Sequence, residues 1–238
     1  MILLFDIDGT LVRCGGAGKA ALERAFHRLH GIEAALAAVR LDGSTDPVIV
    51  DTAFRARFGR SPTAAEHEAL MADYIADLAV SLAARETTYR VLGGVHDLLA
   101  ALDSARDRFV IGLATGNDER GARAKLAPAD LNRYFAFGGY GSDHGDRAIL
   151  VARGIERGQR AAKEALGRDV LPSEAWVFGD TELDVRAAHA AGARAVGVLA
   201  GSSNPEALKA AGPDLLIDGF DDRRLWTHLG LGDPPGGA

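Results

Sequence analysis

The stretch ILLFDIDG, residues 2–9, decides the fold of this chain. It is a short apolar run that ends in two acids and a glycine, which is typical of a buried parallel strand and the turn after it. Five further short apolar runs of this kind lie at residues 109–117, 134–140, 175–180, 194–199 and 214–219. These six runs are predicted to be the strands of a parallel sheet.

Helical segments separate the later strands, because apolar residues recur there at helical spacing at 95–107, 118–127, 147–166, 181–191 and 205–211. Alternating strands and helices indicate an α/β fold, a doubly wound, Rossmann-like parallel sheet covered on both faces. In such a sheet, ligands bind in the crevice at the carboxyl ends of the strands. Polar residues at these ends are therefore the first candidates for a functional site.

The gap between the first two predicted strands is about a hundred residues long, whereas a crossover connection needs a dozen or more. Within this gap, residues 17–30, 46–58 and 64–85 carry apolar residues at helical spacing. We therefore expect an all-helical domain inserted at residues 14–88. Residues 1–13 and 89–238 are expected to form the α/β core domain.

Composition narrows the class of partner. Lys and Arg total 27 against 33 Asp and Glu, with a formal charge of −6 and no basic block, so nucleic acid is not an expected partner. Cys14 is the single cysteine, which excludes an intramolecular disulfide. The apolar start is far too short for a membrane span and no cleavage site follows it. We expect no membrane partner and a cytoplasmic location.

Asp6 and Asp8 close the first predicted strand. Side chains two residues apart in a strand share a face, so both carboxylates can point into one crevice. Two like charges this close favour one ionised group and one group that carries a proton. The alternative interpretation is a solubilising Asp-Gly turn formed by Asp8 and Gly9.

Asp180 ends the fourth predicted strand, and Asp184 follows in the next helix. Four acids at two strand ends would form a strongly negative pocket unless a divalent cation lies there. Carboxylate oxygens without a nearby His or Cys cluster favour Mg²⁺. The structural alternative for Thr181 and Asp184 is a capping box, whose spacing they match.

A phosphate site is predicted after the second strand, where Thr115, Gly116 and Asn117 precede a helix. A hydroxyl and backbone amides at a helix N-terminus form an anion site. Arg147 is the candidate cation, because it begins the helix at 147–166, where a positive charge opposes the helix dipole. The alternatives are a helix cap for Thr115 or Asn117 and a solvated surface position for Arg147.

Taken in order, DIDGT (6–10), Thr115, a basic residue at the start of a later helix and GDTELDV (179–185) resemble the motifs of the haloacid dehalogenase superfamily. The resemblance covers nearly the whole chain. It implies that Asp6 is the nucleophile that accepts the phosphoryl group. It also implies that Asp8 protonates the leaving oxygen and then activates water.

The same resemblance implies two sets of ligands. Mg²⁺ would be held by Asp6, Asp180 and the backbone carbonyl of Asp8, with Asp184 in support. The phosphoryl oxygens would be held by Thr115, Gly116, Asn117 and Arg147. Most members of the superfamily carry lysine where this chain has Arg147.

The helical insert resembles the cap domain of phosphoglycolate phosphatase and β-phosphoglucomutase relatives. Ser44, Thr45 and Asp46 resemble the cap loop that faces the active site, and the alternative is an N-cap at Ser44 or Thr45. Dehalogenation is disfavoured because a halide leaving group needs no acid at Asp8. Phosphonatase chemistry, which is also disfavoured, would need a Schiff-base lysine, and Lys19 is the single lysine of the insert.

These features predict a Mg²⁺-dependent phosphatase that hydrolyses a small phosphorylated metabolite, such as phosphoglycolate, through an aspartyl-phosphate intermediate. A phosphomutase on the same scaffold is the nearest alternative. From another class, a phospho-receiver domain also uses strand-end acids, but it has no room for an insert of about 75 residues. A non-catalytic Mg²⁺-binding protein should have lost one of the four acids.

Overall fold

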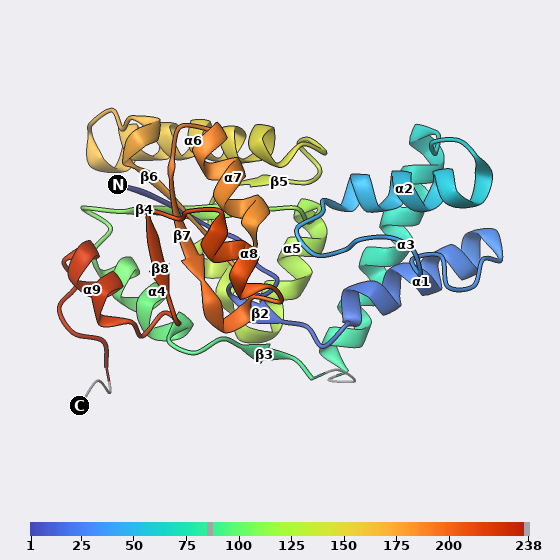
Figure 1. Cartoon of the computed structure of the whole chain (residues 1–238), viewed down its shortest axis with the longest axis horizontal. Helices are drawn as coiled ribbons and strands as arrows, with labels where there is room; N and C mark the ends of the chain where they lie inside the picture. The colour runs from blue at the N-terminus through green and yellow to red at the C-terminus, as the bar shows by residue number, and fades with distance from the viewer. Residues whose placement is uncertain (85–87, 236–238) are drawn as a thin grey trace.

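The computed structural model describes residues 1–84 and 88–235. Residue 85, the last of the helix predicted at 64–85, lies outside the described residues. Six parallel strands form one sheet in the order β5-β4-β1-β6-β7-β8 (Figure 1). Their bounds are β1 Ile2–Phe5, β4 Val110–Thr115, β5 Gly138–Tyr140, β6 Ala175–Gly179, β7 Arg194–Val198 and β8 Leu215–Ile217. The predicted doubly wound α/β class is confirmed.

The central strand β1 contributes to both faces of the sheet, because successive side chains of a strand point in opposite directions. Leu3 and Phe5 belong to one apolar core, and Ile2 and Leu4 belong to the other. The first core is covered by α4 (Val95–Ser104), α5 (Glu119–Leu126) and α9 (Arg223–Leu229). The second is covered by α6 (Arg147–Leu166), α7 (Glu182–Ala190) and α8 (Pro205–Ala210).

The strand order reverses between β1 and β6, since β4 and β5 lie on one side of β1 and the later strands lie on the other. Such a reversal opens a crevice at the carboxyl ends of the two strands. Asp6 follows β1 and Asp180 follows β6. The topology therefore brings together two acids that are far apart in the sequence.

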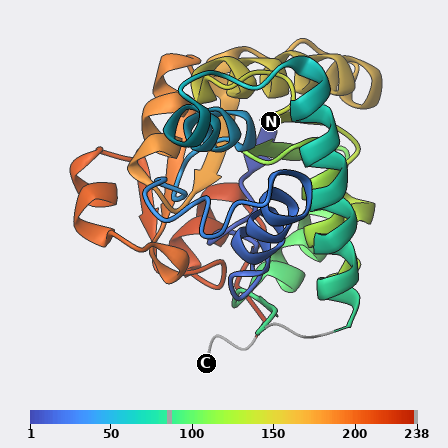
Figure 2. The ribbon, with the colours of Figure 1, turned by 90° about the vertical axis from the view of Figure 1, so that its right-hand side faces the viewer.

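Three helices occupy the described part of the segment between β1 and α4: α1 (Ala17–His30), α2 (Asp46–Phe58) and α3 (Ala64–Ala83). Figures 1 and 2 show them together beside the sheet, where α3 also packs against α5. Two short strands, β2 (Val12–Arg13) and β3 (Arg90–Val91), pair antiparallel at either end of this segment. The predicted domain boundaries stay a prediction.

Some elements differ from the expected ones. The strand expected at 134–140 is confined to Gly138–Tyr140, and Leu131–Tyr134 is a 3₁₀ helix instead. The amide of Asn132 donates to the carbonyl of Arg123, which holds this segment as a turn after α5. The short elements β2, β3 and α9 were not expected, because segments this short carry no recognisable periodicity of apolar residues. None of the helices in the described part of the chain has the length and hydropathy that a membrane crossing requires.

Candidate active site

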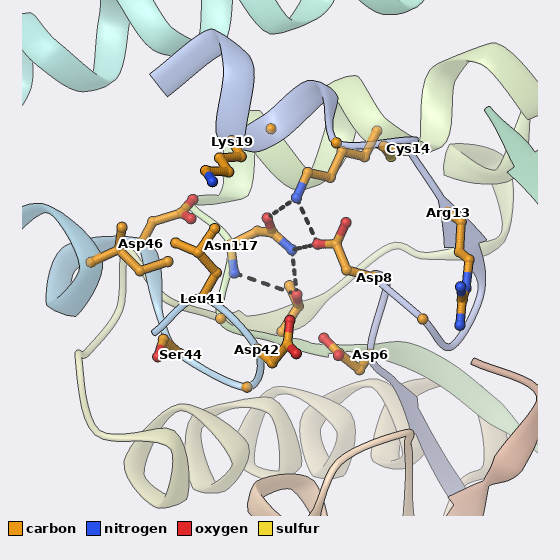
Figure 3. Close-up of a pocket in the computed structure, with 18 of the residues that line it drawn as sticks. Asp6, Asp8, Arg13, Cys14, Lys19, Leu41, Asp42, Ser44, Asp46 and Asn117 are labelled. Carbon is orange, nitrogen blue, oxygen red and sulfur yellow. Dashed lines mark hydrogen bonds and ion pairs between the residues drawn. The ribbon is translucent and has the colours of Figure 1, made fainter. Parts of the chain in front are cut away.

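A cavity of about 680 Å³ lies at the carboxyl end of the sheet, between the strand ends and the inserted helices (Figure 3). Its size suits a small metabolite. The cavity brings together most of the predicted site residues, which are Asp6, Asp8, Ser44, Asp46, Thr115, Gly116, Asn117, Arg147 and Asp180. Asp184 and Thr45 lie behind this lining and contact residues that form it.

Three carboxylates gather at the floor of the site. Asp6, Asp180 and Asp184 each offer one oxygen, and these oxygens lie within 4.8 Å of one another. The guanidinium of Arg147 pairs with Asp184 and lies 3.2 Å from Asp6 Oδ2. Because the Arg147 side chain is 10% exposed, its interpretation as a solvated surface residue is wrong. One buried cation facing three buried carboxylates leaves the site with an excess of negative charge.

The charge balance of the site shows in the pKa values of its acids. Burial raises the pKa of Asp6 above its ordinary value, although the nearby Arg147 opposes this change. Burial also raises the pKa of Asp180, and repulsion from Asp184 and Asp6 adds to the effect. In the absence of a metal, both groups therefore keep their protons to a higher pH than an ordinary aspartate does.

We expect the free energy of unfolding of the metal-free chain to fall as pH rises from about 5 to about 8. Both acids have higher pKa values in the folded chain than in the unfolded chain, so the folded chain holds more protons across this range. Stability is consequently lost as the pH rises through the raised pKa values. Urea unfolding at several pH values in EDTA would measure this slope. Mg²⁺ should flatten the slope, and Asp180→Asn should reduce it; a slope unaffected by either would contradict the assignment.

Asp184 combines the two roles that the sequence left open. Its Oδ2 accepts hydrogen bonds from the backbone N–H (3.0 Å) and the hydroxyl (2.7 Å) of Thr181, so the capping box at the start of α7 is present. Its Oδ1 accepts from Nε of Arg147 at 2.9 Å. Asp184 therefore anchors Arg147 beside Asp6, and both of its oxygens have protein partners.

The predicted phosphate loop follows β4. Thr115 is fully buried, and its hydroxyl oxygen accepts a hydrogen bond of 2.8 Å from the amide of Asn117. Neither residue caps α5, because Asp118 occupies the N-cap and accepts from the backbone N–H of Arg120. The capping alternative for Thr115 and Asn117 is therefore wrong. Their side chains are left to line the cavity.

The predicted cap loop packs directly on this phosphate loop. A Cβ at Gly116 would lie 2.4 Å from the carbonyl oxygen of Ser44, so only glycine permits this approach. The backbone N–H of Asp46 donates to the Gly116 carbonyl at 2.8 Å. The carboxylate of Asp46 accepts from the backbone N–H of Asp118 at 2.8 Å. The loop is thereby held at the edge of the cavity.

The two hydroxyls of this loop do not cap α2. Thr45 occupies the N-cap position without a side-chain cap, and its hydroxyl donates to the carbonyl of Gly145 at 3.0 Å. The hydroxyl of Ser44 donates to the carbonyl of Arg40 at 2.9 Å. Capping by the side chain of either residue is therefore wrong. Thr45 instead ties the inserted helices to the loop before α6.

Sequence reasoning missed one residue of the site, Lys125. Its side chain is buried, and Nζ lies 2.6 Å from Asp8 Oδ2 and 2.6 Å from Asn117 Oδ1. The sequence holds a weak indication of this residue. Lys125 lies on the buried face of α5, next to Leu126 and one turn after Ala122. A lysine on an apolar helical face is a signal that a partner is buried with it.

Comparisons with known proteins agree with this geometry. The sequence profile of the haloacid dehalogenase-like hydrolases matches residues 1–192. The phosphoglycolate phosphatase of Salmonella choleraesuis (strain SC-B67) is 27% identical over 95% of this chain and 91% of its own length. Two examples represent the solved structures that share the fold. A hydrolase from Pseudomonas syringae has a TM-score of 0.69 at 24% identity, covering 96% of this chain and 97% of its own. A predicted phosphoglycolate phosphatase from Haemophilus somnus 129pt has a TM-score of 0.66 at 19% identity, covering 95% and 97%.

Proposed function

The chain belongs to the haloacid dehalogenase-like hydrolase family, and on this premise we propose that it is a Mg²⁺-dependent phosphatase of small phosphomonoesters, with phosphoglycolate as the first candidate substrate. The predictions of this family and of an enzyme of the phosphatase type are confirmed. One observation carries the proposal: Asp6 faces a cavity of metabolite size, beside Arg147 and within a cluster of buried acids.

The acid cluster fits a hard divalent cation. Its members offer carboxylate oxygens, which Mg²⁺ prefers. Asp6 and Asp180, with the backbone carbonyl of Asp8, are the proposed ligands, and Asp184 supports them through Arg147. A bound Mg²⁺ offsets the repulsion between the acids and an incoming phosphoryl group. It would also balance the negative charge that Arg147 alone leaves in the site.

The remaining groups of the phosphate loop orient the ester. In the proposed mechanism, the hydroxyl of Thr115, the amides of Gly116 and Asn117, and Arg147 hold the phosphoryl oxygens. This arrangement places positive and hydrogen-bonding groups where charge builds up during transfer. It also aligns the phosphorus with the carboxylate of Asp6.

Hydrolysis then proceeds in two transfers. A carboxylate oxygen of Asp6 forms a bond to phosphorus as the bond from phosphorus to the leaving oxygen breaks, and Asp8 gives its proton to that oxygen. Water next attacks the aspartyl phosphate, Asp8 takes a proton from the water, and the bond between Asp6 and phosphorus breaks. Inorganic phosphate and free Asp6 result. The side chain of Asp8 is 46% exposed toward the cavity, so both the leaving group and water can reach it.

The cap loop supports selection of the ester. Ser44 and Asp46 line the cavity opposite the strand ends and are the proposed contacts of the leaving group, with Thr45 holding the loop in place. We propose residues 13–16 and 88–94, at the two ends of the helical insert, as hinges, whose opening would admit substrate and whose closure would exclude water. The prediction of a cytoplasmic location stays a prediction.

We expect the chain to release phosphate from 2-phosphoglycolate in the presence of Mg²⁺ and to lose this activity in EDTA, with recovery when Mg²⁺ is restored. A colorimetric phosphate assay measures the release. A phosphomutase would instead return the phosphoryl group to a sugar phosphate without net release. Failure to release phosphate from 2-phosphoglycolate would overturn the substrate, and failure across a panel of phosphomonoesters would overturn the phosphatase assignment.

A further inference from the structure

Among the lysines of the described residues, Lys125 is buried, whereas Lys19, Lys163 and Lys209 are exposed. Its side chain is 7% exposed. Burying an ammonium costs several kcal/mol unless its charge and its protons are satisfied. The structure satisfies them with Asp8 and Asn117, two residues of the proposed reaction site. The position is therefore tied to the site rather than to the packing of α5 alone.

Lys125, Asp8 and Asn117 form a closed triangle of contacts. Figure 3 labels Asp8 and Asn117 and marks the bond between them with a dashed line. Lys125 Nζ lies 2.6 Å from Asp8 Oδ2, and Asn117 Nδ2 lies 2.9 Å from the same oxygen. Asn117 is fixed in turn, because its Oδ1 accepts from Lys125 and its Nδ2 donates to Thr115. Two donors thus hold one oxygen of a side chain that is otherwise open to the cavity.

Both donors act on Oδ2, so a proton carried by Asp8 is directed to Oδ1. We propose that Lys125 is a positioning residue for Asp8: with Asn117 it fixes Oδ2 and leaves Oδ1 facing the cavity, where the leaving oxygen and then water exchange a proton. This inference rests on the proposed function, in which Asp8 carries out the proton transfers. Lys125 itself forms and breaks no covalent bond in this scheme.

Two other roles for Lys125 predict different results. As a purely structural countercharge, Lys125 would affect every substrate to the same degree. As a direct ligand for a second anionic group of the substrate, it would affect only charged leaving groups, since it also lines the cavity. A positioning role instead predicts a loss of activity that is large where the leaving group needs a proton and small where it does not. The three roles therefore separate by substrate.

The test compares wild type, Lys125→Met and the control Lys163→Met, which alters an exposed lysine that pairs with Asp169 on α6. The substrates are 2-phosphoglycolate, ethyl phosphate, whose alkyl leaving group carries no second charge, and 4-nitrophenyl phosphate, whose leaving group departs without a proton. Positioned acid catalysis contributes about 10²- to 10⁴-fold. We expect Lys125→Met to lower kcat/KM, which reports the first transfer alone, by about 10- to 100-fold on both alkyl esters and by less than about 3-fold on 4-nitrophenyl phosphate.

Two further variants separate positioning from folding. In an Asp8→Asn background, Lys125→Met should have no further effect on kcat, because Lys125 acts through Asp8. Lys125→Gln keeps a donor and should recover part of the kcat on ethyl phosphate, while thermal unfolding checks that each variant folds.

Equal losses of kcat/KM on all three substrates, a loss confined to 2-phosphoglycolate, or additive effects with Asp8→Asn would overturn the positioning role while leaving the proposed phosphatase intact. A wild-type chain inactive on all three esters would overturn the proposed function itself, and the positioning role with it.

Discussion

Replacing Asp6 with asparagine is expected to abolish phosphate release, with kcat lowered by on the order of 10⁴-fold or more. Asparagine has nearly the same shape as aspartate, so the backbone after β1 should keep its path. Its amide cannot form the acyl phosphate through which the proposed reaction proceeds. Phosphate release from 2-phosphoglycolate and from 4-nitrophenyl phosphate measures the loss. Both substrates should be affected equally, since the nucleophile serves every leaving group.

The folded state should tolerate this change. Burial and the neighbouring acids raise the pKa of Asp6, so a neutral amide removes repulsion from a crowded site. We expect the free energy of unfolding of Asp6→Asn in EDTA to equal or exceed that of wild type at pH 8. Asp169→Asn, at an exposed carboxylate, is the matched control and should change neither activity nor stability. Turnover by Asp6→Asn within tenfold of wild type would place the nucleophile elsewhere.

The sequence predicts the parts of this site that depend on the order of elements along the chain. Asp6, Thr115 and Asp180 each end a strand whose apolar run is visible in the sequence. Parallel strands put such residues at one edge of the sheet, so their meeting follows from the fold class. The family motifs then added the expected roles.

Contacts across the inserted helices could not be predicted in the same way. The hydroxyl of Thr45 donates a hydrogen bond to the carbonyl of Gly145, and the backbone N–H of Asp46 donates to the carbonyl of Gly116. These pairings depend on how α2 docks against the phosphate loop, and helical spacing carries no information on docking. Local sequence is equally compatible with N-capping, which the hydroxyls of Ser44 and Thr45 do not provide.

Lys125 shows a second limit. A lysine one turn after Ala122 on a short helix is compatible with either a solvated or a buried position. Only the pairing of β4 with β1 in the sheet brings Asp8, which follows β1, within reach of the Lys125 ammonium. Arg147 was easier to single out, because a cation at a helix N-terminus opposes the dipole and calls for a specific partner. The structure supplies Asp6 and Asp184 as its partners.

Arg147→Met is expected to destabilise the fold as well as the reaction. The substitution leaves Asp6, Asp180 and Asp184 buried without their cation. Removing one partner of a buried pair costs about 3–5 kcal/mol. Protonation of the acids relieves this penalty, so the loss of unfolding free energy should be greater at pH 8 than at pH 5. Urea unfolding in EDTA at these two pH values measures it, with Arg153→Met on the exposed face of the same helix as the control.

The response of Arg147→Met to Mg²⁺ separates the charge of the arginine from its geometry. A divalent cation restores positive charge to the acid cluster, so added Mg²⁺ should recover much of the lost stability. It should not recover activity, because the planar guanidinium that Asp184 orients toward Asp6 is absent; kcat should stay about 10²-fold or more below wild type. Arg147→Lys keeps the charge but loses the paired contact with Asp184, so its kcat should lie between that of Arg147→Met and that of wild type. A stability loss in Arg147→Met no greater than in Arg153→Met would mean that the three acids are already neutral without Arg147, and the charge balance proposed for the metal site would have to be abandoned.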